Sequence, residues 1–266
     1  MAMDVLHSGD NPSFKRVRLL ARDAGARRTE RRAVVEGLHL VREAVAAGAQ
    51  RQLWATEAAA ASPEGRALLD SARGTGPSPR LLSAGLFAKL SDTPSPQGWL
   101  CEVETGFKDV PADANLLLAL DSIQDPGNLG TLLRCAWATG AAVLMGRGCA
   151  DAWSPKVLRA GAGAQFHTSM RESADLAADL GELSARGVRL YGTGPRAKES
   201  HLRADCALPH CWVVGSEGAG LSDSVESVCT ASFRIDYPGA AESLNAAVSG
   251  AILLFEALRQ RNSKKA

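Results

Sequence analysis

The chain has 266 residues, a formal net charge of +1, and 45% hydrophobic against 22% charged residues. This composition is typical of a globular protein with a substantial core, and the length suggests about two domains of roughly 100–200 residues each. The near-neutral charge argues against a general polyanion binder, and no run of about 18 apolar residues predicts a membrane span. The first 16 residues lack the apolar core of a signal peptide.

Six cysteines are scattered through the chain without a Cys-x-x-Cys pair. Most of them stand in apolar contexts, which predicts reduced, buried thiols in a cytoplasmic protein. The cysteines and histidines show no metal-ligand spacing, so we expect no metal.

A basic segment extends from Lys15 to Arg32 and holds eight Lys and Arg residues against Asp23 and Glu30. Such a run is commonly the solvated face of a helix, and it is also typical of a segment that contacts phosphates. No aromatic residue lies within it, so base stacking is not indicated there. The sequence leaves both interpretations open.

The first part of the chain alternates helix and strand patterns, which predicts a small α/β domain over residues 1–107. We expect helices at 13–24, 38–48, 63–73 and 81–92, and strands at 31–37, 51–56 and 100–106. The polar stretch 108–114 contains a proline and is the expected linker.

The second part, residues 115–266, predicts a parallel α/β sheet. Residues 115–121 are a nearly continuous apolar run, as expected of a central strand covered on both faces. Further strands are expected at 141–146, 188–194, 211–216 and 233–236, with helices at 128–139, 172–186, 222–228 and from near Leu244. Ligands in such folds bind at the carboxyl ends of the strands, which selects the loops 121–128, 193–196, 215–220 and 236–245.

Two predicted helices carry apolar stripes. In the helix at 128–139 the expected apolar face excludes Arg134 and consists of Leu129, Leu132, Leu133, Ala136 and Trp137. Arg134 is then either a common surface arginine or one that binds a substrate phosphate. In the last helix the spacing of three and four predicts a core-facing stripe of Val248, Ala251, Ile252, Phe255 and Leu258.

The stretch Gly192–Ala197 formally matches a dinucleotide-binding fingerprint, G-x-G-x-x-A. It follows the third expected strand of its domain rather than the first, and Pro195 offers no backbone N–H to a phosphate. A nucleotide-dependent oxidoreductase is therefore the disfavoured alternative.

Three stretches taken together resemble a known family. DPGNLGTLLR, VVGSEGAGLS and ESLNAAVS are similar to the three signature motifs of the SpoU (TrmH-like) branch of the SPOUT RNA methyltransferases. The resemblance covers about residues 116–261, and the stretch 154–167 is similar to the family's middle segment. More loosely, VEGLHLVREAVAAG and LSDTPSPQGWL resemble the L30e-like substrate-binding domain that precedes the catalytic domain in many members.

The resemblance implies a parallel-sheet α/β domain with a C-terminal trefoil knot, preceded by the small α/β domain. It implies S-adenosylmethionine as cofactor, methyl transfer to a ribose 2′-hydroxyl of RNA, and a homodimer whose site is completed across the interface. Ribosomal RNA is favoured over transfer RNA as the target by analogy with members that have this N-terminal domain. A non-catalytic RNA-binding member is disfavoured because the polar motif residues are present.

The motif positions also imply the site residues. The candidate catalytic residues are Arg134, Asn128, Glu217, Ser243 and Asn245, and the candidate cofactor-binding residues are Thr193, Gly215, Ile235 and Leu244. Arg134 would orient or deprotonate the ribose hydroxyl with help from an RNA phosphate, although a free arginine is a very poor base. The family usually has Ile-Pro where this chain has Ile235-Asp236, which leaves open whether a carboxylate stands near the cofactor.

Overall fold

The computed structural model describes residues 5–74 and 76–263, so the first four and the last three residues of the expected domains lie outside the described residues. The chain divides into two compact units, one of Met1–Gly106 with Trp153–Phe166 and one of Phe107–Ala152 with His167–Ala266. Residues 153–166 thus pack with the first unit, although they fall within the stretch expected in the second. Among the described residues, no helix is long and apolar enough to cross a membrane.

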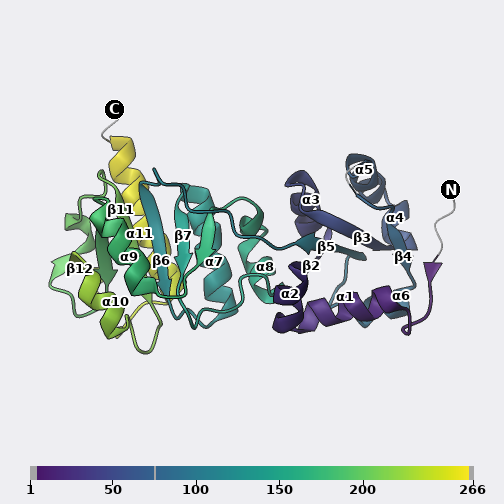
Figure 1. Cartoon of the computed structure of the whole chain (residues 1–266), viewed down its shortest axis with the longest axis horizontal. Helices are drawn as coiled ribbons and strands as arrows, with labels where there is room; N and C mark the ends of the chain where they lie inside the picture. Colours follow the sequence, from purple (N-terminus) through teal and green to yellow (C-terminus); the bar gives the residue numbers. More distant parts are fainter. Residues whose placement is uncertain (1–4, 75, 264–266) are drawn as a thin grey trace. The chain divides into compact units, whose positions relative to one another are not determined.

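The first unit is built on a five-stranded sheet with the order β1-β4-β3-β5-β2 (Figure 1). Its strands are β1 Val5–Leu6, β2 Arg32–Glu36, β3 Gln50–Thr56, β4 Arg80–Leu82 and β5 Trp99–Glu104. Its helices are α1 Pro12–Arg22, α2 Ala24–Glu30, α3 Leu38–Ala46, α4 Glu57–Ala61, α5 Pro63–Ser71, α6 Ala84–Ala88 and α8 Pro155–Gly161, followed by the 3-10 turn η1 Ala164–Phe166. Strand β5 pairs antiparallel with both β2 and β3, so this sheet is mixed.

Helix α1 follows from local sequence signals and an apolar stripe. The Asn11 side chain accepts a hydrogen bond from the backbone N–H of Ser13, and Pro12 occupies the first turn, where its missing N–H costs nothing. The buried Phe14 packs in a core cluster with Trp54. Beside this cluster the buried Glu102 carboxylate accepts hydrogen bonds from Trp54 Nε1 (3.1 Å) and Arg16 Nη2 (2.7 Å), which satisfies a charge that would otherwise be costly to bury.

Three of the predicted helices are wrong in extent. The helix predicted at 81–92 is the short strand β4 followed by α6, and Ser83 caps α6. The helix predicted at 13–24 is divided at Asp23, which ends α1 and caps α2. In the second unit, the helix predicted at 172–186 is replaced by a strand at Met170–Glu172 and a helix that begins only at Leu176.

The second unit is built on a seven-stranded sheet with the order β10-β12-β9-β11-β6-β7-β8, in which every neighbouring pair is parallel. Its strands are β6 Leu116–Asp121, β7 Ala142–Met145, β8 Met170–Glu172, β9 Arg189–Thr193, β10 Glu199–Ser200, β11 His210–Gly215 and β12 Ala231–Arg234. Its helices are α7 Pro126–Thr139, α9 Leu176–Ala185, α10 Asp223–Val228 and α11 Ala246–Ser263, with the 3-10 turn η2 His201–Arg203.

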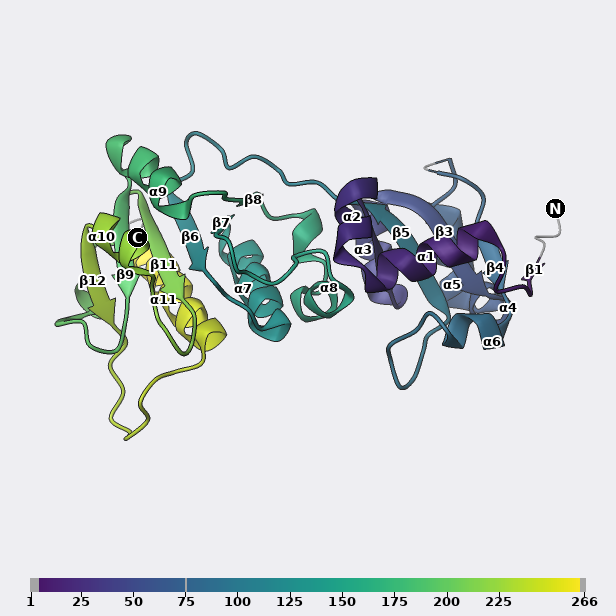
Figure 2. The same ribbon diagram turned by 60° about the horizontal axis from the view of Figure 1, so that its bottom comes forward.

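Helices cover both faces of this sheet. Figures 1 and 2 show α9 and α10 on one face and the neighbouring helices α7 and α11 on the other. The central strand β6 is buried along its whole length, which agrees with its continuous apolar sequence. On the α9 side, Leu117 and Ala119 of β6 share a core cluster with Leu180 and Val225.

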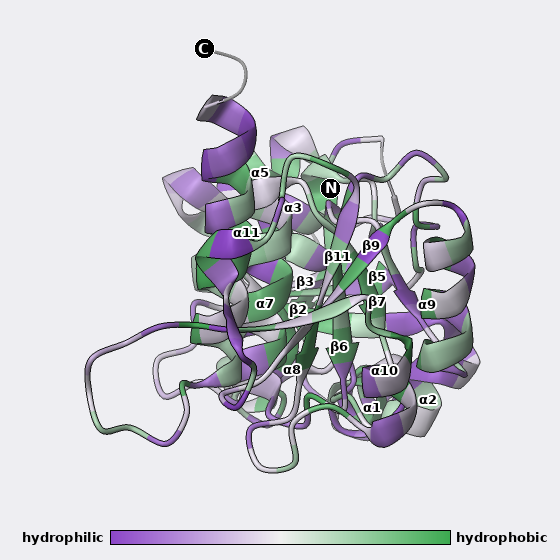
Figure 3. Cartoon of the chain, turned by 90° about the vertical axis from the view of Figure 1, so that its left-hand side faces the viewer, coloured by the Kyte–Doolittle hydropathy of each residue, from purple (hydrophilic) through white to green (hydrophobic). Residues whose placement is uncertain are grey.

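The expected core faces of α7 and α11 are partly wrong. Val248 and Phe255 of α11 are 48% and 49% exposed, and Trp137 of α7 is 39% exposed and stacks on His167. The face of α11 that is buried contains mainly small and apolar residues, namely Ala246, Ala247, Gly250, Leu253, Leu254 and Ala257. Figure 3 shows that only the C-terminal turns of α11 are strongly hydrophilic.

Candidate cofactor and catalytic site

The loops at the carboxyl ends of β9, β11 and β12 enclose a cavity of about 690 Å³ in the second unit. Its lining includes all four residues predicted to bind the cofactor, Thr193, Gly215, Ile235 and Leu244, together with Glu217 and Ser243. The parallel arrangement of the strands explains this, because their carboxyl ends meet at one edge of the sheet. The structure therefore brings together three of the four loops selected from the sequence around one cavity.

The loop after β11 is a tight turn that requires glycine. Ser216 and Gly220 exchange two backbone hydrogen bonds of 3.1 and 2.9 Å, and Gly220 has a φ of +74°. A Cβ atom on Gly215 would overlap the backbone of Gly220. The absence of side chains at these positions lets backbone N–H and C=O groups approach a ligand closely.

Three of the predicted catalytic residues form one hydrogen-bonded triangle. Glu217 Oε1 accepts hydrogen bonds from Asn128 Nδ2 and Asn245 Nδ2, both at 2.7 Å. Asn245 Nδ2 also lies 2.8 Å from Asn128 Oδ1. These residues come from the start of α7, the loop after β11 and the start of α11, so the triangle joins three separate parts of the second unit.

The triangle also caps helix α11. Asn245 Oδ1 accepts hydrogen bonds from the backbone N–H groups of Ala247 (3.0 Å) and Val248 (3.2 Å), and Glu217 Oε1 accepts one from Ala246 (3.3 Å). A carboxylate at a helix N-terminus is favoured by the unpaired N–H groups and by the helix dipole. Capping is thus a structural role of these side chains beside the one predicted for them.

The other two predicted catalytic residues lie outside the triangle. Ser243 is exposed and lines the cavity. Arg134 is exposed on α7 and is not part of the cavity lining, and within the described part of the chain its guanidinium has no hydrogen-bond or ion-pair partner. The position agrees with the prediction that Arg134 faces away from the core.

Asp121, at the end of β6, was not among the predicted site residues. This buried carboxylate accepts hydrogen bonds from the backbone N–H (2.7 Å) and the hydroxyl (2.8 Å) of Ser222, and so fixes the far end of the loop after β11. An acidic residue directly after a run of buried leucines was the available signal, because a buried carboxylate needs partners. Arg196 and Tyr237 also line the cavity and were not singled out as site residues, and Glu242, the first residue of the third motif, lines it as well.

Asp236 and the dinucleotide-like stretch both have structural explanations. Asp236 pairs with Arg234 Nε at 2.9 Å and is not among the residues that line the cavity. The dinucleotide interpretation fails because Gly192 lies inside β9, where its missing Cβ leaves room for Cys229, Ser232 and Leu221. In addition, β9 runs on to strand β10 rather than into an α-helix.

The six cysteines do not supply a nucleophile or a disulfide. All six are free thiols, and burial raises the pKa of each, to about 12 for Cys101 and to about 11 for Cys149. Such thiols remain protonated near neutral pH and are poor nucleophiles. Among the residues that the structure describes, no group of three or more His, Cys, Asp or Glu side chains is placed to hold a metal ion.

The fold and the site define a parallel α/β ligand-binding domain whose cavity is made by strand-end loops, preceded in the chain by a separate mixed-sheet unit. Residues 115–255 match the model of the SpoU rRNA Methylase family, and residues 11–101 match that of the MRM3-like substrate binding domain. The chain belongs to the SpoU rRNA methylase family.

Named relatives agree with this assignment. The chain is 32% identical to an uncharacterized tRNA/rRNA methyltransferase of Synechocystis sp., covering 96% of this chain and 93% of the relative. It is also 32% identical to the Bacillus subtilis 23S rRNA (guanosine(2553)-2′-O)-methyltransferase RlmP, covering 84% and 86%. The SpoU methyltransferase AviRb from Streptomyces viridochromogenes, solved with the cofactor AdoMet, superposes with a TM-score of 0.84 at 25% identity, covering 95% of this chain and 99% of that one.

Proposed function

We propose that this protein is an S-adenosylmethionine-dependent methyltransferase that methylates a ribose 2′-hydroxyl of ribosomal RNA in the cytoplasm. The observation that carries the proposal is the Asn128–Glu217–Asn245 triangle, which shares Glu217 with the cavity between the strand-end loops. The rRNA 2′-O-methyltransferase activity named for the Bacillus subtilis relative supports the reaction type. An expected trefoil knot in the strand-end loops belongs to the same proposal.

The cavity fits the proposed cofactor. Apolar side chains of Val214, Phe233 and Ile235 offer surfaces for an adenine ring, and the glycine-rich turn at 215–220 offers backbone groups to its edge. The carboxylates of Glu217 and Glu242 favour a cationic sulfonium group nearby. When bound, S-adenosylmethionine supplies an activated methyl group.

The protein's own side chains would then prepare the ribose. We assign Arg134 to the ribose hydroxyl and a neighbouring phosphate, because a guanidinium binds a phosphate through two parallel hydrogen bonds. Its very high pKa makes orientation of the hydroxyl a more effective role than direct proton removal. Asn128 and Asn245 hold the Glu217 carboxylate, and Ser243 offers a hydroxyl on the cavity wall.

A homodimer is part of the proposal. Val248 and Phe255 on α11 and Trp137 on the neighbouring α7 are large, exposed apolar side chains. Exposed apolar surface of this kind is characteristic of protein–protein contacts. Since α7 also carries Arg134, a partner copy on this face would bring its own loops near that guanidinium.

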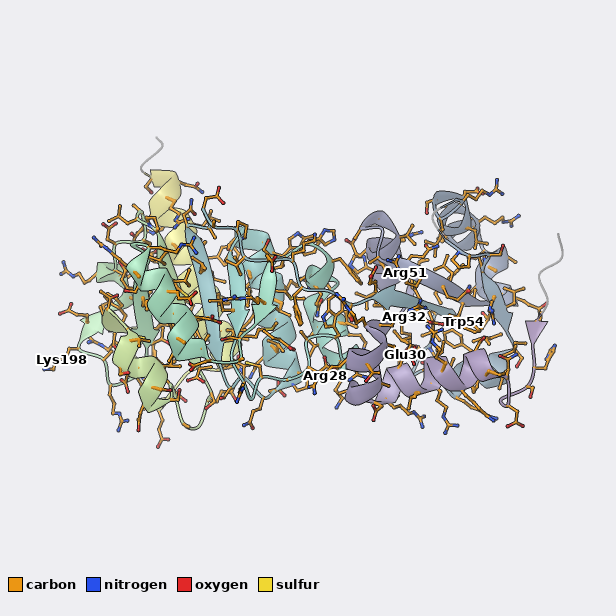
Figure 4. The ribbon with its side chains drawn as sticks, viewed as in Figure 1. Arg28, Glu30, Arg32, Arg51, Trp54 and Lys198 are labelled. Atoms are coloured by element: carbon orange, nitrogen blue, oxygen red, sulfur yellow. The ribbon has the colours of Figure 1, made fainter. Side chains whose placement is uncertain are left out.

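The basic segment supports a role of the first unit in RNA binding. Four of its cations are already engaged, because Lys15 pairs with Asp10, Arg16 with Glu30, and Arg32 with Glu102, while Arg27 donates to the Leu20 carbonyl. The other four, Arg18, Arg22, Arg28 and Arg31, are exposed, and of these Arg22 donates a hydrogen bond to the Lys89 carbonyl at 3.4 Å. Figure 4 labels Arg28 on α2, Arg32 on β2 and Trp54 on β3.

We expect these exposed cations to contact phosphates. Replacing Arg18 and Arg22 by Glu should weaken rRNA binding and lower the slope of log affinity against log salt by roughly one per lost contact. The matched control replaces Arg66, on α5, and Arg73, just after its end, by Glu, since α5 lies on the other side of the sheet from α1 in Figure 1. An equal loss of rRNA affinity in both variants would contradict the assignment of these cations to phosphate contacts.

A binding test and a mapping test address the proposed function. S-adenosylmethionine should raise the melting temperature of the protein and NAD should not, since only a ligand of the native state stabilises it. The opposite result would overturn the proposal. Mapping 2′-O-methyl sites in rRNA and tRNA from a deletion strain should reveal one missing site in rRNA, whereas a missing site in tRNA would overturn the choice of target.

A further inference from the structure

The cavity that we assign to the cofactor has an uneven distribution of charge. Its charged lining residues in the described part of the chain are the carboxylates Glu217 and Glu242 and the single cation Arg196. Glu217 is engaged by Asn128 and Asn245, whereas Arg196 is exposed and makes no hydrogen bond or ion pair with any described residue. An arginine in this position is free to bind an anionic group of a ligand.

The loop that carries Arg196 is held at both ends. At its start the Gly194 N–H donates to the Phe233 carbonyl at 3.1 Å. At its end the Arg234 guanidinium donates to the carbonyls of Ala197 (3.1 Å) and Lys198. Lys198, labelled in Figure 4, marks this end of the loop at the edge of the sheet. Arg234 therefore fixes the backbone at Ala197 and Lys198, the two residues that directly follow Arg196.

Asp236 completes this arrangement. Side chains from Arg234 to Tyr237 alternate in position: Ile235 and Tyr237 line the cavity, whereas Arg234 and Asp236 do not. Asp236 Oδ1 lies 2.9 Å from Arg234 Nε, and a hydrogen bond with Ser200 and the nearby Arg234 lower the pKa of this carboxyl. The carboxylate thus orients the guanidinium that holds the Arg196 loop.

We propose that Arg196 binds the carboxylate at the methionyl end of the cofactor and that the Arg234–Asp236 pair positions Arg196 to do so. The proposal rests on the proposed function, which supplies the cofactor. A guanidinium matches a carboxylate through two parallel hydrogen bonds, and the alternative lining charges, Glu217 and Glu242, would repel it. The same carboxylates suit the cationic ammonium and sulfonium groups of that ligand.

Calorimetric titration with two ligands tests the role of Arg196. S-adenosylhomocysteine carries the carboxylate, and methylthioadenosine has the same nucleoside without the amino-acid end. Arg196→Ala should lower the affinity for S-adenosylhomocysteine roughly tenfold or more and leave that for methylthioadenosine unchanged, as expected for loss of a charge-assisted bond. Arg196→Lys should keep part of the affinity, because the charge remains.

The outcomes separate this inference from the proposed function. If the wild-type protein binds neither ligand, both are overturned. If it binds S-adenosylhomocysteine and Arg196→Ala binds it equally well, or loses both ligands equally, only the role of Arg196 is overturned. Unchanged ligand affinity with weaker rRNA binding would also overturn it and would assign Arg196 to an RNA phosphate.

The positioning role needs its own variants. Asp236→Ala should lower the affinity for S-adenosylhomocysteine selectively, and by less than Arg196→Ala does. Asp236→Asn should keep most of the affinity, because an acceptor oxygen remains. The control is Asp205→Ala, since Arg189 and Asp205 form an ion pair of similar exposure in the same unit (44% and 43%, against 37% and 45% for Arg234 and Asp236) away from the cavity lining. Equal ligand selectivity in Asp236→Ala and Asp205→Ala would overturn the positioning role.

Discussion

Glu217 is the residue on which the candidate site converges. One oxygen of its carboxylate accepts hydrogen bonds from Asn128, Asn245 and the backbone of Ala246. These bonds hold the two amide side chains in one geometry beside the cavity, and misplacing positioning groups by about 1 Å can cost on the order of 100-fold in rate. We therefore expect Glu217→Ala to lower the rate of methyl transfer by roughly 10- to 100-fold.

The melting temperature separates this effect from unfolding. Glu217 is exposed, so Glu217→Ala should melt within a few degrees of the wild-type protein. Full activity of Glu217→Ala, or a loss of activity that follows unfolding, would contradict the functional role.

His210 gives a prediction for the dependence of stability on pH. The side chain is buried, its Nδ1 lies 2.8 Å from the Leu208 carbonyl, and burial lowers its pKa from 6.5 to about 4. Between these pH values the unfolded chain binds more protons than the folded one. The contribution of the neutral His210 to stability is therefore fully present above pH 6.5 and is lost as the pH falls towards 4. At pH 5 the loss should be about 2 kcal/mol.

Urea unfolding at pH 7.5 and pH 5 measures this loss. His210→Phe keeps an aromatic ring next to Tyr191 and Trp212 and removes the titrating group. The free energy of unfolding of this variant should change correspondingly less between the two pH values. An equal change in the variant and the wild-type protein would assign the pH dependence to other groups.

At the scale of elements, the contact between α7 and α11 depends on Gly250. A Cβ atom at this position would overlap Leu132 Cδ2 of α7. Gly250→Val should therefore lower the free energy of unfolding by about 1–3 kcal/mol through overpacking.

Gly181 on α9 is the matched control, because a Cβ there meets nothing within 4 Å. Gly181→Ala should raise the free energy of unfolding by up to about 1 kcal/mol, since glycine is unfavourable inside a helix. Chemical denaturation measures both variants, and a Gly250→Val protein as stable as the wild type would contradict the close packing.

The elements also show how far the sequence determines the fold. The strand at 116–121 was predictable because it is apolar along its whole length, and the order of the strand-end loops located the cavity. Strand β4 was not predictable, because three residues are too few to show an alternation of apolar and polar side chains. In addition, Leu81 and Leu82 continue a helical pattern into α6. The period of α11 was correct and its buried face was wrong, because small residues such as Gly250 make the close contact while larger ones remain outside.

The sequence predicted which residues belong to the candidate site better than it predicted the hydrogen bonds between them. The motif order identified Asn128, Glu217 and Asn245, but their mutual hydrogen bonds depend on how three distant segments meet. Among the supporting residues, Asp121 carried a signal as a carboxylate at the end of a buried strand, but its partner Ser222 did not. The contact of Arg234 with the loop at Ala197 was not predictable either, because that loop has no regular structure.

At the scale of the whole molecule, the exposed apolar residues predict dimerisation through α11. Phe255→Glu should convert a dimer into a monomer in light scattering, because a buried unpaired charge is costly. Leu19→Glu, at a similarly exposed position on α1 of the first unit (50%), should remain dimeric. A monomeric wild-type protein, or a dimeric Phe255→Glu variant, would contradict this interface.

Methyl transfer to rRNA from a strain that lacks this protein tests the central claim most directly. The wild-type protein with labelled S-adenosylmethionine should produce a single 2′-O-methylated nucleoside in that rRNA. Arg134→Ala should produce none while binding S-adenosylhomocysteine normally, and Arg203→Ala, at an exposed arginine of the same unit that lies outside the cavity lining, should act like the wild type. Label on a base, or no transfer by the wild-type protein, would contradict the proposed activity, and wild-type turnover by Arg134→Ala would contradict the role of Arg134.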